Sequence, residues 1–230
     1  KIRYIILEKL PHDLIFDRKK YNEDQLKILN AVKRENLQRN YISKGLYDAN
    51  KQDVIIISDL DEIPNLSHIR FANIKNKTLY IFKQKFYYYK FDLENVLHIW
   101  PGSKMCKFNF LQSPQWLRNV KSKKYNFWRI DTIFSKKKYQ NIEFVENGGW
   151  HFTYLKTPEL IQKKLRTYLH HQEYEAHPLS IEQIKNLVSS KKVLYDHFLD
   201  QRVQNKFDSG VQLKKAPYTE LPPYIQNNLV

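Results

Sequence analysis

Three carboxylates follow a short apolar run in the segment VIIISDLDEIP, residues 54–64. The run is β-branched and too short for a helix, so it predicts a buried strand that ends at the acids. Ligands of open α/β sheets bind beyond the carboxyl ends of the strands. Asp59 and Asp61 would point the same way while the strand lasts, so both can reach one cation. The alternative is a solvated loop, since crowded carboxylates are costly unless a cation binds or water surrounds them.

The elements before this strand predict how it is positioned. Residues 4–7, YIIL, predict a first strand, and Asn22 can cap a helix that runs from Glu23 to about Leu46. Strand, long helix and strand form a βαβ unit, which implies a parallel pair. We therefore expect an α/β fold with a mostly parallel central sheet.

The elements after the acidic segment predict more strands and helices. The aromatic stretch 78–91 predicts a strand, and Trp100, Pro101 and Gly102 predict a turn. Ser113 before a proline predicts a helix start. A second helix is expected from Thr157 to about Tyr174, and Ser180 with Gln183 predicts a capping box. The proline-rich residues 216–230 predict an extended tail.

Composition limits the class of protein. The 230 residues fit one domain, and no apolar run approaches the roughly 20 residues of a membrane span. A single cysteine, Cys106, excludes an internal disulfide. The net charge of +15 would attract nucleic acid, anionic membrane or phosphate. The lysines are dispersed, however, so a solvated surface is the simpler reading and no nucleic-acid partner is expected. Because the only methionine is Met105, we expect the chain to begin inside a longer reading frame.

Four stretches of the chain form a recognisable series. In chain order they are RENLQRNYI (34–42), SDLDEIP (58–64), GGWHFTY (148–154) and LPPYI (221–225). Together they resemble glycosyltransferase family seventeen, whose animal members add the bisecting N-acetylglucosamine to N-glycans. SDLDEIP paired with GGWHF is a specific combination, and the other two stretches support it.

The resemblance implies a GT-A fold, a nucleotide-sugar-binding α/β sandwich over residues 1–230 that lacks its first elements here. It implies a metal-dependent inverting glycosyltransferase. The expected donor is a UDP-sugar, with N-acetylglucosamine favoured, and the expected acceptor is a glycan or glycoprotein. A cation must stabilise the diphosphate that leaves, and carboxylates select Mn²⁺ or Mg²⁺ for that task.

Within this resemblance the acidic segment holds the metal. Asp61 is the expected direct ligand, while Asp59 binds through water or holds the ribose. Glu62 would orient the pair. His151 is the expected third contact, because the GGWHF turn resembles a segment that returns to the metal or diphosphate; a structural histidine is the alternative.

Other residues are candidates for the donor site and for catalysis. Trp150 flanks the donor sugar or fills the core, and Arg118 and Arg129 bind the diphosphate or are surface arginines. An inverting displacement needs a base for the acceptor hydroxyl. The segment HHQE, residues 170–173, resembles a segment of microbial members. The base candidates are Glu173, Asp131 and Glu146.

Two other functions stay open. A haloacid-dehalogenase-type phosphatase also places DxD after an apolar strand, with Asp59 as nucleophile, although Ile63 departs from that pattern. A basic polyanion-binding module would explain the charge and the aromatics, but it leaves the acidic cluster unexplained.

Overall fold

The computed structural model describes residues 2–126, 128–132, 134–167, 171–199, 203 and 205–228. Within these residues the chain is an α/β protein with a seven-stranded mixed sheet, ordered β1-β4-β3-β6-β2, with β5 beside β3 and β7 beside β4. The two long strands are β3 (Leu79–Tyr88) and β4 (Leu93–Lys107). The chain divides into two compact units, and both long strands contribute residues to each unit.

The first unit comprises Lys1–Asp59, Ser67–Phe82 and Ser103–Val145. Two of its helices begin at the predicted caps. The Asn22 side chain accepts a hydrogen bond from the Gln25 amide, and the Ser113 side chain accepts one from the Trp116 amide. Its elements are α1 (Glu23–Tyr41), β1 (Val54–Ile57), α2 (Pro114–Asn119), β5 (Ile142–Val145) and the 3₁₀ turns Ile42–Leu46, Phe71–Asn73, Phe108–Phe110 and Ile130–Thr132.

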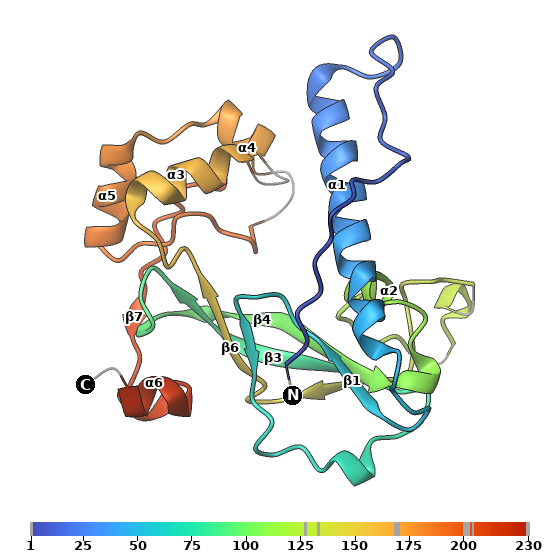
Figure 1. Ribbon diagram of the computed structural model, residues 1–230. Helices are drawn as coiled ribbons and strands as arrows, with labels where there is room; N and C mark the ends of the chain where they lie inside the picture. The colour runs from blue at the N-terminus through green and yellow to red at the C-terminus, as the bar shows by residue number, and fades with distance from the viewer. Residues whose placement is uncertain are drawn as a thin grey trace. The chain divides into compact units, whose positions relative to one another are not determined.

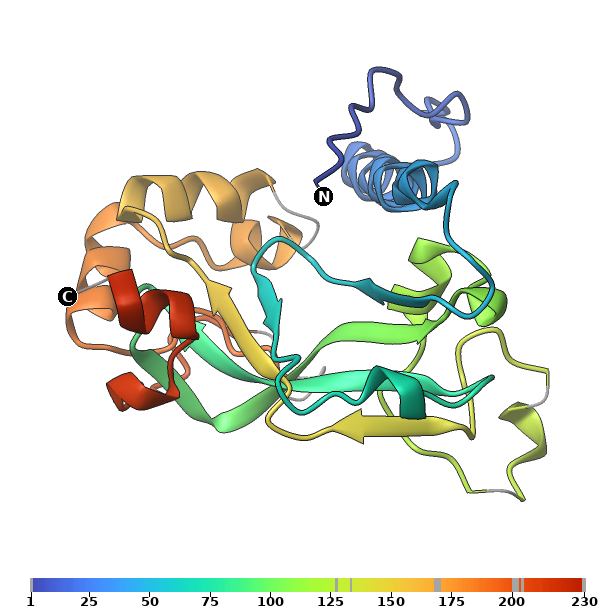
Figure 2. The same ribbon diagram turned by 60° about the horizontal axis from the view of Figure 1, so that its bottom comes forward.

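The predicted parallel βαβ unit is wrong. Residues 4–7 form no strand, and the segment before α1 runs beside that helix, as Figure 1 shows in dark blue. The Asn30 amide fixes this segment by bonding both the amide and the carbonyl of Ile15, each at 2.8 Å. β1 pairs antiparallel with the end of β4, from Val54 opposite Lys107 to Ile57 opposite Lys104. The sheet is mostly antiparallel; β3 runs parallel to β5 and β6 (Figure 2).

The second unit comprises Leu60–Leu66, Lys83–Gly102 and Glu146–Val230. In this unit α3, α4 and α5 cover one face of the strands and α6 covers the other (Figure 1). Alternate residues of β3 face the two cores, since Tyr88 packs with Ile161 and Ile184, whereas Tyr87 packs with Ile225. The elements are β2 (Glu62–Pro64), β6 (Gly149–Thr153), α3 (Pro158–Thr167), α4 (His171–Ala176), α5 (Ile181–Ser189), β7 (Lys214–Lys215), the 3₁₀ turn Tyr218–Glu220 and α6 (Pro223–Asn228).

Two predictions for this unit are wrong and one is confirmed. Trp100, Pro101 and Gly102 lie within β4 and make no turn. The tail is not extended throughout, because α6 occupies much of it. The capping box of Ser180 and Gln183 is confirmed at the start of α5. None of the helices in the described part of the chain has the length and apolar character needed to cross a bilayer.

Candidate functional site

Asp59 lies two residues beyond the end of β1, between two arginines. Its Oδ1 accepts a hydrogen bond from Arg39 Nη2 at 3.1 Å, and its Oδ2 accepts one from Arg118 Nη2 at 2.8 Å. Both arginine side chains are largely buried, at 17% and 11% exposure. Two guanidinium groups therefore offset the charge of this carboxylate, and the carboxylate holds them in place.

The helices α1 and α2 position these arginines. Arg39 also donates to Gln115 Oε1 at 2.9 Å and pairs with Glu35 at 2.6 Å, one helical turn earlier. The backbone amide of Gln115 in turn donates to Asn40 Oδ1 at 3.1 Å. Sequence reasoning predicted a role for Arg118 but missed Arg39, although its spacing from Glu35 was a visible signal.

Asp61, Glu62 and His151 come together in the second unit. β2 pairs antiparallel with β6, so Glu62 lies opposite His151. Asp61 Oδ1 lies 3.8 Å from His151 Nδ1, and the Asp61 carbonyl accepts a hydrogen bond from the Phe152 amide at 2.8 Å. The Asp61 side chain is 39% exposed, whereas that of His151 is 8% exposed. The pair thus has one solvent-facing carboxylate and one buried imidazole.

Gly149 makes this pairing of β2 and β6 possible. Its φ is +121°, and a Cβ at this position would lie 2.1 Å from the Ile63 carbonyl oxygen. The adjoining Gly148 accepts a hydrogen bond from the Asn65 amide at 2.9 Å. A glycine is therefore required at position 149 both by the positive φ and by the close approach of the β2 backbone.

Three rings lie near the Asp61–His151 pair and are called the aromatic wall below: Trp100, Phe86 and His197. The Trp100 ring stacks on His151 at 4.5 Å and 11°, and its Nε1 donates to Glu62 Oε1 at 3.0 Å. Phe86 lies 4.9 Å from the His151 ring, and His197 lies 5.6 Å from Trp100. Sequence reasoning missed Trp100 and His197. Glu62 is buried and bonded to the indole, so its carboxylate faces Trp100 and not solvent.

Glu173 binds Tyr195, whose ring packs against His197 of the aromatic wall. The Tyr195 hydroxyl donates a hydrogen bond to Glu173, and Lys206 Nζ lies 3.7 Å from the same carboxylate. The Tyr195 ring lies 4.7 Å from His197, which contacts Trp100. His170, the other notable residue of the HHQE segment, lies outside the described residues.

The other predicted acids and arginine have partners of their own. Arg129 binds Asp131 through two hydrogen bonds of 2.7 and 2.9 Å. With Lys138, this arginine holds the pKa of Asp131 well below its usual range, so the carboxyl is a poor proton acceptor. Glu146 pairs with Lys83 at 2.6 Å on the surface.

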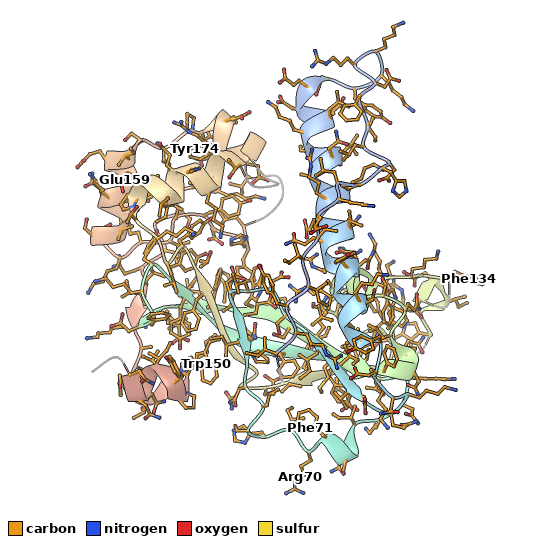
Figure 3. The ribbon with its side chains drawn as sticks, viewed as in Figure 1. Arg70, Phe71, Phe134, Trp150, Glu159 and Tyr174 are labelled. Atoms are coloured by element: carbon orange, nitrogen blue, oxygen red, sulfur yellow. The ribbon has the colours of Figure 1, made fainter. Side chains whose placement is uncertain are left out.

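Trp150 belongs to a core. Its Nε1 donates to the Glu220 carbonyl at 2.7 Å, and its ring packs partly buried beside Tyr87 and Phe152. Figure 3 shows it next to the C-terminal helix. This environment agrees with the core-filling alternative for Trp150.

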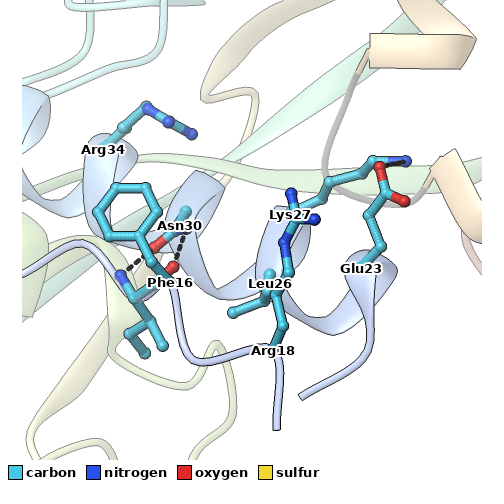
Figure 4. Close-up of a pocket in the computed structure, with 8 residues that line it drawn as sticks. Phe16, Arg18, Glu23, Leu26, Lys27, Asn30 and Arg34 are labelled. Carbon is cyan, nitrogen blue, oxygen red and sulfur yellow. Dashed lines mark hydrogen bonds and ion pairs between the residues drawn. The ribbon is translucent and has the colours of Figure 1, made fainter. Parts of the chain in front are cut away.

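The first unit also contains a pocket that none of the predicted site residues lines. It has a volume of about 230 Å³ and lies between the segment before α1 and α1 itself (Figure 4). Its lining includes the basic side chains of Arg18 and Arg34 and the apolar side chain of Leu26. The Asn30 side chain in it already bonds the Ile15 backbone and so attaches the preceding segment to α1.

The described part of the chain groups few possible metal ligands together. Among the described residues, no three His, Cys, Asp or Glu side chains are grouped to hold an ion. Asp61 and His151 place one carboxylate oxygen and one imidazole nitrogen 3.8 Å apart. Mg²⁺ is commonly held by one or two carboxylates, with substrate phosphates and water completing the shell. Asp61 could supply one such carboxylate.

Comparisons with known proteins give no relative. No protein-family model matches the chain, and no curated protein and no solved structure matches it either.

Proposed function

We propose that this chain is a metal-dependent inverting glycosyltransferase of GT-A type that uses a nucleotide-sugar donor. N-acetylglucosamine from UDP is the favoured donor group, and the acceptor is a hydroxyl of a glycan or glycoprotein. The observation that carries the proposal is the antiparallel pairing of Glu62 with His151. It joins SDLDEIP and GGWHF, the two segments of the specific resemblance, although they lie about 90 residues apart in the sequence.

In this proposal Asp61 and His151 hold Mn²⁺ or Mg²⁺ together with the donor's phosphates. The ion would stabilise the negative charge of the departing diphosphate. The exposed Asp61 carboxylate can meet a ligand from solvent, while stacking on Trp100 fixes the orientation of the imidazole. Glu62 holds the Trp100 indole and so supports His151.

Asp59 has a different role from Asp61. Because Arg39 and Arg118 occupy both of its oxygens, Asp59 serves better as the anchor of two guanidinium groups than as a direct metal ligand. The same hydrogen bonds weaken the phosphatase alternative, since a nucleophilic Asp59 would have to release them.

Glu173 is the proposed base. Tyr195 and Lys206 hold its carboxylate, and Tyr195 leads to the aromatic wall through His197. Glu173→Gln is expected to abolish transfer and to leave nucleotide binding within about twofold, because only the base is lost. Wild-type turnover by this variant would remove Glu173 from the mechanism.

The first test is calorimetry of UDP binding with Mn²⁺, repeated with EDTA. The expected result is binding that needs the metal and that weakens at least about tenfold in Asp61→Asn. Asp24→Asn is the matched control, since it removes one surface carboxylate from the first turn of α1. Binding that ignores both EDTA and Asp61→Asn, or the absence of UDP and GDP binding in every condition, would contradict the proposal.

A further inference from the structure

The loop from Lys121 to Gln140 concentrates positive charge. Seven basic side chains and one acidic side chain give it a net charge of +6 over residues 121–140. Elsewhere the lysines are more dispersed, which is why the total charge alone does not identify a partner. Within the loop, Asp131 is engaged by Arg129 and Lys138. Five further lysines are Lys121, Lys123, Lys124, Lys136 and Lys137.

Three large apolar side chains of the loop are exposed, whereas the polar Thr132 is buried. Trp128, Ile130 and Phe134 are 63%, 68% and 85% exposed. Thr132, between them in the sequence, is 7% exposed; its hydroxyl donates to the Arg129 carbonyl at 2.6 Å and accepts from Gln140 Nε2 at 3.0 Å. Three large apolar side chains of one short segment therefore meet solvent beside a cluster of lysines, and exposed apolar groups gathered in this way are typical of interaction surfaces.

The loop is fixed at its base. The Lys121 amide donates to the Lys137 carbonyl at 2.7 Å, which closes the loop. Beside it, the Tyr139 hydroxyl accepts from Trp116 Nε1 of α2 at 2.8 Å. Figure 3 shows Phe134 directed away from the protein. These two hydrogen bonds attach the base of the loop to the rest of the first unit.

We infer that this loop binds the surface of an anionic lipid bilayer. Trp128, Ile130 and Phe134 would enter the interfacial region, where aromatic and aliphatic groups are stabilised. The lysines around them would meet anionic headgroups, which attract basic side chains within a Debye length. This inference is independent of the proposed catalytic function.

Nucleic acid is a weaker match for the same surface. Recognition of bases and phosphates uses arginine for stacking and for bidentate bonds. The one arginine of the loop, Arg129, already makes a bidentate bond with Asp131. Ile130 offers no ring for stacking on a base, whereas it suits a hydrocarbon boundary.

The test is co-sedimentation with vesicles of phosphatidylcholine alone and of phosphatidylcholine with phosphatidylserine. We expect binding only to the anionic vesicles, weakening as salt rises. The triple variant Trp128→Ala, Ile130→Ala, Phe134→Ala is expected to bind at least about tenfold more weakly. Phe71→Ala is the matched control, because Phe71 is also exposed, at 45%, and lies outside the loop.

A second pair of variants separates local charge from total charge. Lys136→Gln with Lys137→Gln should weaken binding about tenfold, whereas Lys19→Gln with Lys20→Gln should change it less than about twofold. Far-ultraviolet circular dichroism checks that each variant is folded. The inference is overturned if wild type does not bind anionic vesicles, or if the loop and control variants bind equally. It is also overturned if the loop variants lose binding to single-stranded RNA and retain binding to vesicles.

Discussion

Replacing Tyr87 by phenylalanine is expected to stabilise the protein. Tyr87 is fully buried in β3, on the face that packs against Phe152, Leu221 and Ile225. Its hydroxyl has no hydrogen-bond partner among the described residues. Burial, reinforced by two nearby glutamates, raises the pKa of Tyr87 well above its ordinary value, so the hydroxyl stays neutral.

The size of the effect follows from comparing neighbouring tyrosines. Burying a hydroxyl without a hydrogen-bond partner costs about 1–3 kcal/mol of desolvation, which the phenylalanine variant recovers. The variant also loses the dispersion contacts of the oxygen with the core, which offsets part of this gain. We expect Tyr87→Phe to raise the free energy of unfolding by about 1 kcal/mol. Tyr88 is also fully buried, but its hydroxyl donates to the Tyr195 carbonyl at 3.0 Å. Tyr88→Phe should therefore lower the free energy of unfolding by about 1–2 kcal/mol.

The assay is urea unfolding of wild type, Tyr87→Phe and Tyr88→Phe, supported by calorimetry. For a chain of this size, 1 kcal/mol corresponds to a shift of about 2–4 °C in Tm. The reasoning is refuted if Tyr87→Phe destabilises the protein as much as Tyr88→Phe does. That result would mean that the Tyr87 hydroxyl makes a hydrogen bond in solution.

Three further outcomes are expected. Gly149→Ala should destabilise the second unit by about 2–4 kcal/mol in urea unfolding, because its Cβ would meet the Ile63 carbonyl at a positive φ; an unchanged midpoint would contradict the close approach. Burial raises the pKa of Glu94 above its usual 4.5, so the folded state favours the protonated carboxyl. The stability that this carboxyl contributes is present below pH 4.5 and is lost as pH rises through the folded-state pKa. Glu94→Gln should therefore gain stability relative to wild type as urea unfolding is repeated from pH 4.5 to 7, and a constant difference would count against this. Burial raises the pKa of the Cys106 thiol to about 12, so native protein should react with a thiol reagent far more slowly than unfolded protein, and equal rates would refute it.

Helix starts could be predicted from sequence because their chemistry is local. Asn22, Ser113 and Ser180 each bond an amide three residues ahead, and all three helices begin there. The tail shows a local signal that was read wrongly. Pro223 is the first residue of α6, a position that favours proline, and Leu221 and Ile225 bury themselves beside Tyr87.

Strand direction could not be predicted, because it depends on distant partners. The run Val54–Ile57 has the same apolar pattern whether its neighbour is parallel or antiparallel, and its partner proves to be the end of β4. Gly102 gave a false signal for a turn. A Cβ there would lie 1.7 Å from Gln84 Oε1, so the glycine serves close packing within a continuous strand.

The directions of the Asp59 and Asp61 side chains could not be predicted from the local sequence pattern. Alternation along a strand predicted that Asp59 and Asp61 point the same way, but β1 ends at Ile57, before either residue. Beyond a strand end, partners decide where a side chain points. Arg118 binds Asp59, whereas Asp61 lies beside His151. His151 reaches that position because Gly149 lets the β6 backbone approach β2 closely. Arg39 and Arg118 lie 20 and 59 residues from Asp59 in the sequence, and His151 comes from the distant GGWHF segment, so the two aspartates have different environments despite their shared motif. A variant of one should therefore not reproduce a variant of the other.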